Sequence, residues 1–118
     1  MGLLSAASQI HLLALPSREL GDGLTLLVAS TRRARGRGLA GVDELPANHA
    51  LLLEPCRSVH TIGMRFALDL LWLDATGAIV RIDAAVAPRR MQSCRRARAV
   101  VECAAGAGER FAAALAPS

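Results

Sequence analysis

Runs of apolar residues, separated by residues that favour turns, predict most of the strands of this chain. We expect strands over residues 10–15, 24–29, 49–54, 58–62, 68–73, 78–84 and 99–103. Pro16 and the cluster at residues 17–23 are expected to turn the chain between the first two strands. The segment Asp74-Ala75-Thr76-Gly77 joins two apolar runs and predicts a hairpin with Gly77 in the left-handed conformation.

Two short helices are expected beside these strands. Ser30 or Thr31 offers a hydroxyl that can cap the first helix, and Gly38 is expected to end it. The Ala-rich segment 109–115 predicts the second helix, with Phe111 on its apolar face. The basic stretch 89–96 is expected to form a loop.

This order of elements predicts an α+β fold: a mainly antiparallel β-sheet or half-open small barrel with two short helices, near residues 31–38 and 108–116. The expected core residues are Leu52, Leu70, Trp72, Val80, Ile82, Val100 and Phe111.

Length and composition are those of one globular domain, residues 1–118, with 53% hydrophobic residues. No apolar run reaches the ~18 residues of a membrane span. The apolar start is interrupted by His11 and has no Arg before it, so it does not match a secretory signal. The three cysteines show no Cys-x-x-Cys spacing, which indicates free thiols in a reducing compartment. We therefore expect a soluble cytoplasmic protein.

The stretch PCRSVHTIGMRFALDLLWLD, from Pro55 to Asp74, resembles the uncharacterised bacterial and archaeal domain-of-unknown-function family numbered 192. The runs RRARGRGLAG, ELPANHALLLEPC and ARAVVECAAG resemble flanking parts of the family in its order, so the resemblance covers about residues 24–110. The run His60-Thr61-Ile62-Gly63-Met64 resembles one branch of the family, because many members carry Trp-Met-x-Asn-Thr there. Members usually continue past the last helix with one more strand, whereas this chain stops at Ser118. The resemblance implies a compact, mainly β domain and no assigned activity.

A short polar break between two apolar strands holds the residues best suited to ligand binding. His60, Thr61, Met64 and Arg65 lie in this break, and Asp69 follows it within an apolar strand. Loops on a rigid sheet commonly carry binding residues. We therefore expect a site for a small molecule or a peptide around His60–Asp69, and a well-packed corner without a ligand is the alternative.

Two acids stand within apolar strands, Asp69 and Glu102. A buried carboxylate is costly unless it finds partners. For Asp69 these could be Arg65, Arg57 or backbone amides, and such a charge-assisted bond would fix the neighbouring loop. A structural role is therefore favoured over a catalytic one for both acids.

Cys56 and His60 are weak candidates for a catalytic pair, because an imidazole can activate a thiol. On one extended strand they would be about 13 Å apart, and nothing in the sequence marks an oxyanion hole or a third group. These two residues with Cys94 and Cys103 also lack the paired-ligand spacing of a metal site. We expect a non-enzymatic binding or accessory domain with no metal and no cofactor, and a Cys/His-dependent enzyme is the alternative.

All 14 basic residues are Arg, and the net charge is +4. Two clusters, Arg32–Arg37 and Arg89–Arg98, could contact phosphates, so an Arg-patch nucleic-acid binder is a further alternative. Aromatic residues make up only 3% of the chain, which leaves few side chains for base stacking. An unidentified small molecule or protein is therefore the expected partner. The sequence does not decide whether an exposed sheet edge pairs with a second copy to form a homodimer.

Overall fold

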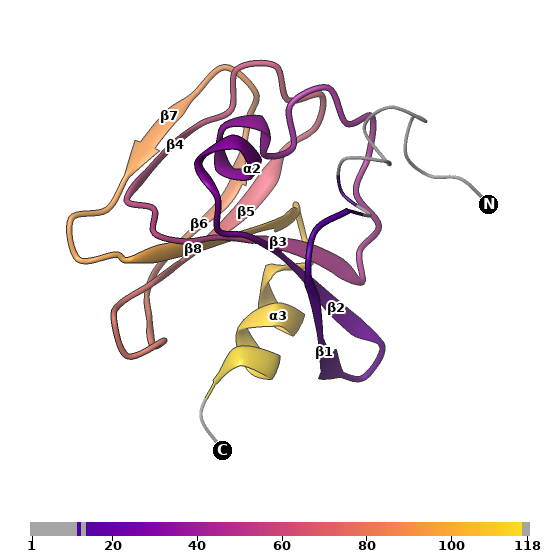
Figure 1. Cartoon of the computed structure of the whole chain (residues 1–118), viewed down its shortest axis with the longest axis vertical. Helices are drawn as coiled ribbons and strands as arrows, with labels where there is room; N and C mark the ends of the chain where they lie inside the picture. The colour runs from indigo at the N-terminus through magenta and orange to yellow at the C-terminus, as the bar shows by residue number, and fades with distance from the viewer. Residues whose placement is uncertain (1–11, 13, 117–118) are drawn as a thin grey trace.

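The computed structural model describes residue 12 and residues 14–116 (Figure 1). Its elements in chain order are β1 (Ser17–Gly21), β2 (Leu24–Ala29), α2 (Arg32–Arg37), β3 (His49–Leu53), β4 (Ser58–His60), β5 (Leu68–Leu73), β6 (Ile79–Val86), β7 (Met91–Ser93), β8 (Ala99–Ala104) and α3 (Gly108–Leu115). No helix in this part of the chain is both long enough and apolar enough to cross a membrane.

A six-stranded sheet organises the molecule, with the strand order β1-β2-β3-β8-β5-β6. The pair β2–β3 is parallel, and the other neighbours are antiparallel. A parallel pair needs a crossover, which α2 and the loop after it provide (Figure 1). Strands β4 and β7 form a separate antiparallel ribbon. The predicted α+β fold is confirmed: the sheet is mostly antiparallel and is not closed into a barrel, and over residues 14–116 the helices α2 and α3 accompany it.

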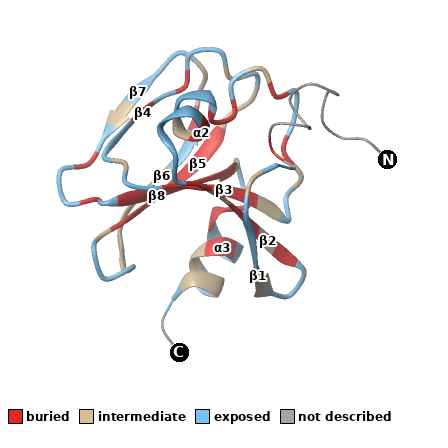
Figure 2. Ribbon diagram, viewed as in Figure 1, coloured by how far each residue is buried: buried red, intermediate tan, exposed pale blue. Residues whose placement is uncertain are grey.

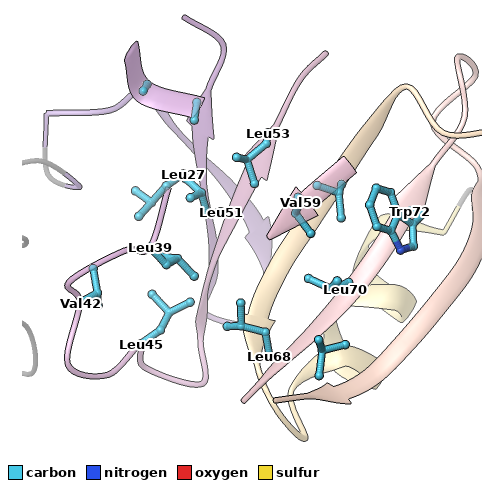
Figure 3. Close-up of a cluster of buried hydrophobic side chains, with 14 of the residues drawn as sticks. Leu27, Leu39, Val42, Leu45, Leu51, Leu53, Val59, Leu68, Leu70 and Trp72 are labelled. Atoms are coloured by element: carbon cyan, nitrogen blue, oxygen red, sulfur yellow. The ribbon is translucent and has the colours of Figure 1, made fainter. Parts of the chain in front are cut away.

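The sheet separates two apolar clusters. Helix α3 covers one face and buries Phe111 there, against side chains such as Leu26 and Val101. The opposite face is covered by α2, the loop after it and the β4–β7 ribbon, which contribute Leu39 and Val59 to the larger cluster (Figure 3). Because both faces are covered, β3, β5 and β8 are almost wholly buried (Figure 2).

Local sequence signals place the helix start and the central hairpin as predicted. Thr31 Oγ1 accepts a hydrogen bond of 3.1 Å from the Ala34 N–H, which caps α2, and Gly38 follows its last residue. In the β5–β6 hairpin, Asp74 Oδ1 accepts a backbone N–H bond of 2.8 Å from Thr76, and Gly77 has a φ of 86°.

The structure corrects the prediction for residues 17–23. Residues Ser17–Gly21 form strand β1 rather than a turn, and the turn of the β1–β2 hairpin contains Asp22 and Gly23, whose φ values of 53° and 75° are both positive. The strand was missed because most of its residues are exposed, so its sequence shows no apolar pattern. Of the strand predicted over 10–15, residues 10, 11 and 13 lie outside the described residues, and residues 12, 14 and 15 form no strand.

Three further predictions were wrong in part. The basic loop at residues 89–96 contains the short strand β7, which pairs with β4. Ile82 was expected in the core but is 48% exposed, and Val80 is only half-buried, because both lie on the edge strand β6. The other expected core residues are buried: Leu52, Leu70, Trp72, Val100 and Phe111.

Trp72 is the largest fully buried side chain, and its polar atom has a partner. Its Nε1–H donates to Asp83 Oδ2 over 2.9 Å, and Arg81 Nη2 donates to the same oxygen over 2.9 Å. The Arg81 guanidinium also lies over the indole ring, 5.4 Å from the centroid. Asp83 therefore satisfies the indole and holds the cation in place.

We expect Asp83→Ala to lower the free energy of unfolding by about 1–3 kcal/mol, because it leaves the buried indole N–H without an acceptor. Asp43→Ala is the matched control: Asp43 pairs with Arg65 on the exposed surface, where an ion pair contributes about 0–1 kcal/mol. Urea denaturation of both variants measures the difference. Equal losses would contradict the role given to Asp83.

Candidate functional site

The buried acid of β8 faces the side of the sheet that α2 covers. Glu102 is in register with Leu51 of β3 and Leu70 of β5, which both belong to the apolar cluster on that side. Val101 and Cys103, its neighbours in the strand, belong to the cluster under α3. The alternation of side chains along a strand therefore directs the carboxyl of Glu102 toward α2.

A cavity of about 450 Å³ lies in this region, and Glu102 is one of its lining residues. Helix α2 and the turn after it line one side. The end of β3, the connection to β4 and β4 itself line another. The lining residues are Arg35, Gly36, Arg37, Gly38, Ala40, Leu53, Pro55, Cys56, Arg57, Ser58, Val59, His60, Met64 and Glu102. Small-molecule sites commonly have this volume, with an apolar wall and a few polar groups.

Backbone hydrogen bonds fix the connection that forms part of the wall. The Cys56 N–H donates to the Arg98 carbonyl oxygen over 2.8 Å, and the Cys94 N–H donates to that of Arg57 over 2.9 Å. On the other side, Arg35 Nη1 donates to the carbonyl oxygens of Ser30 and Glu54. The cavity is therefore bounded by segments that are anchored to the sheet and to the segment between β7 and β8.

Glu102 is unusual for a charged residue, because it is only 1% exposed and its Oε1 has no hydrogen-bond partner among the described residues. Burial raises the pKa of this carboxyl to about 7, since the charged form is poorly solvated there. Near neutral pH the group can therefore hold a proton or accept a donor from a bound molecule.

The two weak catalytic candidates line the same cavity, but they do not form an activated pair. Within the described residues no hydrogen bond joins Cys56 to His60. Instead, Cys56 Sγ donates to the Ser58 carbonyl oxygen over 3.3 Å. Burial is the main reason that the pKa of the Cys56 thiol is raised. A protonated thiol is a poor nucleophile, so this environment does not favour thiolate chemistry.

Of the residues predicted to bind a ligand, only His60 and Met64 line the cavity. Thr61 is 1% exposed, and its hydroxyl donates to the Ala87 carbonyl oxygen over 2.8 Å and accepts the Arg90 N–H over 2.7 Å. These two hydrogen bonds therefore hold the segment after β6 against the end of β4.

The other two predicted ligand residues also lie outside the cavity lining. Arg65 pairs with Asp43 on the surface. Asp69 accepts backbone N–H bonds from Ala85 at 2.8 Å and from Gly106 and Gly108 at 2.9 Å. Of the partners considered from the sequence, backbone amides are therefore the ones that Asp69 uses.

Sequence reasoning missed that Arg35, Arg37 and Glu102 meet at one cavity. Glu102 carried a visible signal, an acid inside an apolar strand, but its strand is far from α2 in the sequence. Only the crossover topology brings the two together. Over residue 12 and residues 14–116, no three His, Cys, Asp or Glu side chains gather as a metal site.

Fold and cavity together define a small α+β domain in which a crossover helix and a two-stranded ribbon enclose a pocket over a mixed sheet. The chain belongs to the family DUF192, described as an uncharacterized ACR, whose model matches residues 16–114. No curated protein is significantly similar to the chain.

Two solved structures share the fold. One is a protein from Sinorhizobium meliloti 1021, described as a proposed transcription regulator. It has a TM-score of 0.67 and 22% identity over 75% of this chain and 74% of that chain. The other is a protein of unknown function from Novosphingobium aromaticivorans DSM 12444, with a TM-score of 0.66 and 16% identity over 93% of each chain. At these identities the likeness concerns the fold alone.

The close approach of Gly108 to Asp69 leads to a stability prediction. A Cβ at residue 108 would lie 2.7 Å from Asp69 Oδ2 and 3.1 Å from its Cβ, so Gly108→Ala must displace the carboxylate. We expect a loss of about 1–3 kcal/mol in the free energy of unfolding. The control is Gly36→Ala in α2, where nothing lies within 4 Å of the added Cβ and the helix gains up to about 1 kcal/mol. Thermal unfolding of both variants measures this, and a neutral Gly108→Ala would contradict the assigned packing.

The buried carboxyl of Glu102 leads to a prediction about pH. Its pKa is higher in the folded protein than the ordinary value of 4.5, so the folded state holds the proton more tightly than the unfolded state does. This contribution to stability is complete below about pH 4.5 and is lost as the pH rises through about 7. Relative to Glu102→Gln, the native protein should lose on the order of 3 kcal/mol between about pH 5 and pH 8. Urea denaturation at both pH values tests this, and parallel curves would contradict it.

Proposed function

We propose that this protein is a small non-enzymatic binding domain, and that its ligand occupies the cavity lined by Cys56, His60, Met64 and Glu102. One observation carries the proposal: the Glu102 carboxyl lines the cavity, and its buried Oε1 has no partner in the described structure. Buried polar groups are nearly always hydrogen-bonded. A bound molecule with a donor would supply the missing bond, and the cavity volume suits a small molecule rather than a folded partner.

The enzyme alternative receives less support from the geometry. The Cys56 thiol donates a hydrogen bond to the Ser58 carbonyl oxygen, and the pKa of the thiol is raised rather than lowered. Activated cysteines show the opposite shift.

A nucleic-acid-binding role is the second candidate, and one observation favours it. The arginines of the second basic cluster, Arg89, Arg90, Arg95, Arg96 and Arg98, are all exposed. The structurally similar Sinorhizobium protein is described as a proposed transcription regulator. Binding that relies on such a surface would weaken steeply with salt.

The test is a metabolite screen of the native protein by NMR, using backbone amide shifts. We expect hits that shift the amides of residues 35–40 and 53–60, because these segments line the cavity. Cys56 provides an independent readout: it lines the cavity and is half-buried, whereas Cys94 and Cys103 are buried. A true ligand should therefore slow alkylation of Cys56 by iodoacetamide.

Two results would refute the proposal. One is a screen in which no compound both shifts these amides and protects Cys56. The other is a DNA or RNA fragment that binds with a steep salt dependence and shifts the amides around residues 89–98 instead, which would favour the second candidate. Alkylation of Cys56 in unfolded protein gives the reference rate.

A further inference from the structure

The proposed binding site has opposite electrical character at its rim and at its buried carboxyl. We propose that it selects a small bipolar molecule, in which an anionic group binds the arginines Arg35, Arg37 and Arg57 and an amine binds Glu102. This inference rests on the proposed function, because it specifies the ligand class of the same cavity.

The arginines supply the anion-binding end. Among residues 12 and 14–116, no carboxylate forms an ion pair with any of the three. Arg35 and Arg57 are held in place by backbone carbonyl oxygens, Arg57 Nε donating to that of Ala97 over 3.1 Å. These bonds use only part of the five N–H donors of each guanidinium. Arg37 is exposed and has no side-chain partner in the described structure. Guanidinium groups with free donors favour carboxylates and phosphates.

Glu102 supplies the other end. Its Oε1 is buried without a donor, and β3 and β5 present only Leu51 and Leu70 beside it in the sheet. An arginine close to Glu102 would lower the pKa of its carboxyl. The pKa is instead raised, and burial is the cause. The arginines therefore do not neutralise the charge of this group. An ammonium group provides both a hydrogen-bond donor and the positive charge that pairs with an ionised carboxylate.

The two ends together define the ligand class better than either does alone. A simple amine would bind in a cavity that three arginines also line, and these repel a cation. A simple anion would leave Glu102 without a donor. The lining also contains Leu53, Pro55 and Val59, so the middle of the molecule is expected to be apolar. An ω-amino carboxylate has all three features.

The interaction should depend on pH, because the ammonium binds the ionised form of Glu102. The charged and titratable groups around the cavity are Arg35 and Arg37 from α2, Cys56 and Arg57 from the connection, and His60 from β4. The arginines keep their charge at all working pH values, and the amine remains protonated. Affinity should therefore rise about tenfold per pH unit as Glu102 ionises and level off above about pH 7.

The experiment compares matched probes by calorimetry and NMR: ω-amino carboxylates from γ-aminobutyrate to ε-aminocaproate and longer, with caproate and hexylamine as single-ended controls. The native protein should bind one of the amino carboxylates about tenfold or more tightly than either control. Glu102→Gln should abolish this advantage and the pH dependence without weakening caproate. His60→Gln should keep the pH dependence, which separates the two titratable groups.

A second pair of variants tests the rim without touching the buried carboxyl. Arg37→Gln should weaken both the amino carboxylate and caproate about threefold to tenfold, since it removes one guanidinium. Arg33→Gln removes the same charge from the same helix, but Arg33 does not line the cavity, so it should leave binding unchanged.

Each result has a defined meaning. If caproate or hexylamine binds as tightly as every amino carboxylate, the bipolar ligand class is wrong. If no probe of any length binds while the metabolite screen yields cavity ligands, this inference fails and the binding function stands. If neither probes nor screen give a cavity ligand, the proposed function fails with it.

Discussion

The carboxylate of Asp69 is the constraint on which the arrangement of the sheet and α3 depends. It lies in β5, between β8 and the edge strand β6, and accepts three backbone N–H bonds. Two of these donors, Gly106 and Gly108, belong to the chain as it leaves β8 and enters α3. The third, Ala85, has a φ of 52° near the end of β6. A buried charge of this kind is tolerable because the amides replace the water it has lost. One side chain thereby fixes where α3 begins and how the edge strand ends.

Glu102 is a second buried acid, but among the described residues it lacks the backbone amide donors that Asp69 has. It lies in β8, in register with Leu70 of the strand that carries Asp69, and it is also buried. Its carboxyl faces the cavity under α2, whereas Asp69 is bonded at the start of α3. The carboxylate of Asp69 is hydrogen-bonded to backbone amides, whereas Oε1 of Glu102 has no partner in the described structure. The hydrogen-bond partners therefore distinguish these two carboxyl groups more clearly than burial does.

Much of the fold could be predicted because its signals are local. The cap of α2 at Thr31, the hairpin at Asp74–Gly77 and the apolar run of β5 each follow from a few adjacent residues. The misses have a physical cause as well. Strand β1 and residue Ile82 lie at sheet edges, where pairing rather than burial decides the structure. Of the residues that line the candidate site, the sequence singled out Cys56, His60 and Met64 as candidate site residues. Arg35, Arg37 and Glu102 come from segments far apart in the sequence, which the crossover brings together.

The position of β8 has a consequence for how the protein is made. It lies between β3 and β5, yet it is the last strand that the structure describes in chain order. While the chain emerges from the ribosome, β1–β2–β3 and β5–β6 can pair only as two separate half-sheets, each with an open inner edge. Residues 99–104 close both edges at once. The sheet therefore becomes continuous only after residues 99–104 have been made, and a nascent chain stopped before residue 99 exposes two unpaired strand edges to chaperones or to other chains.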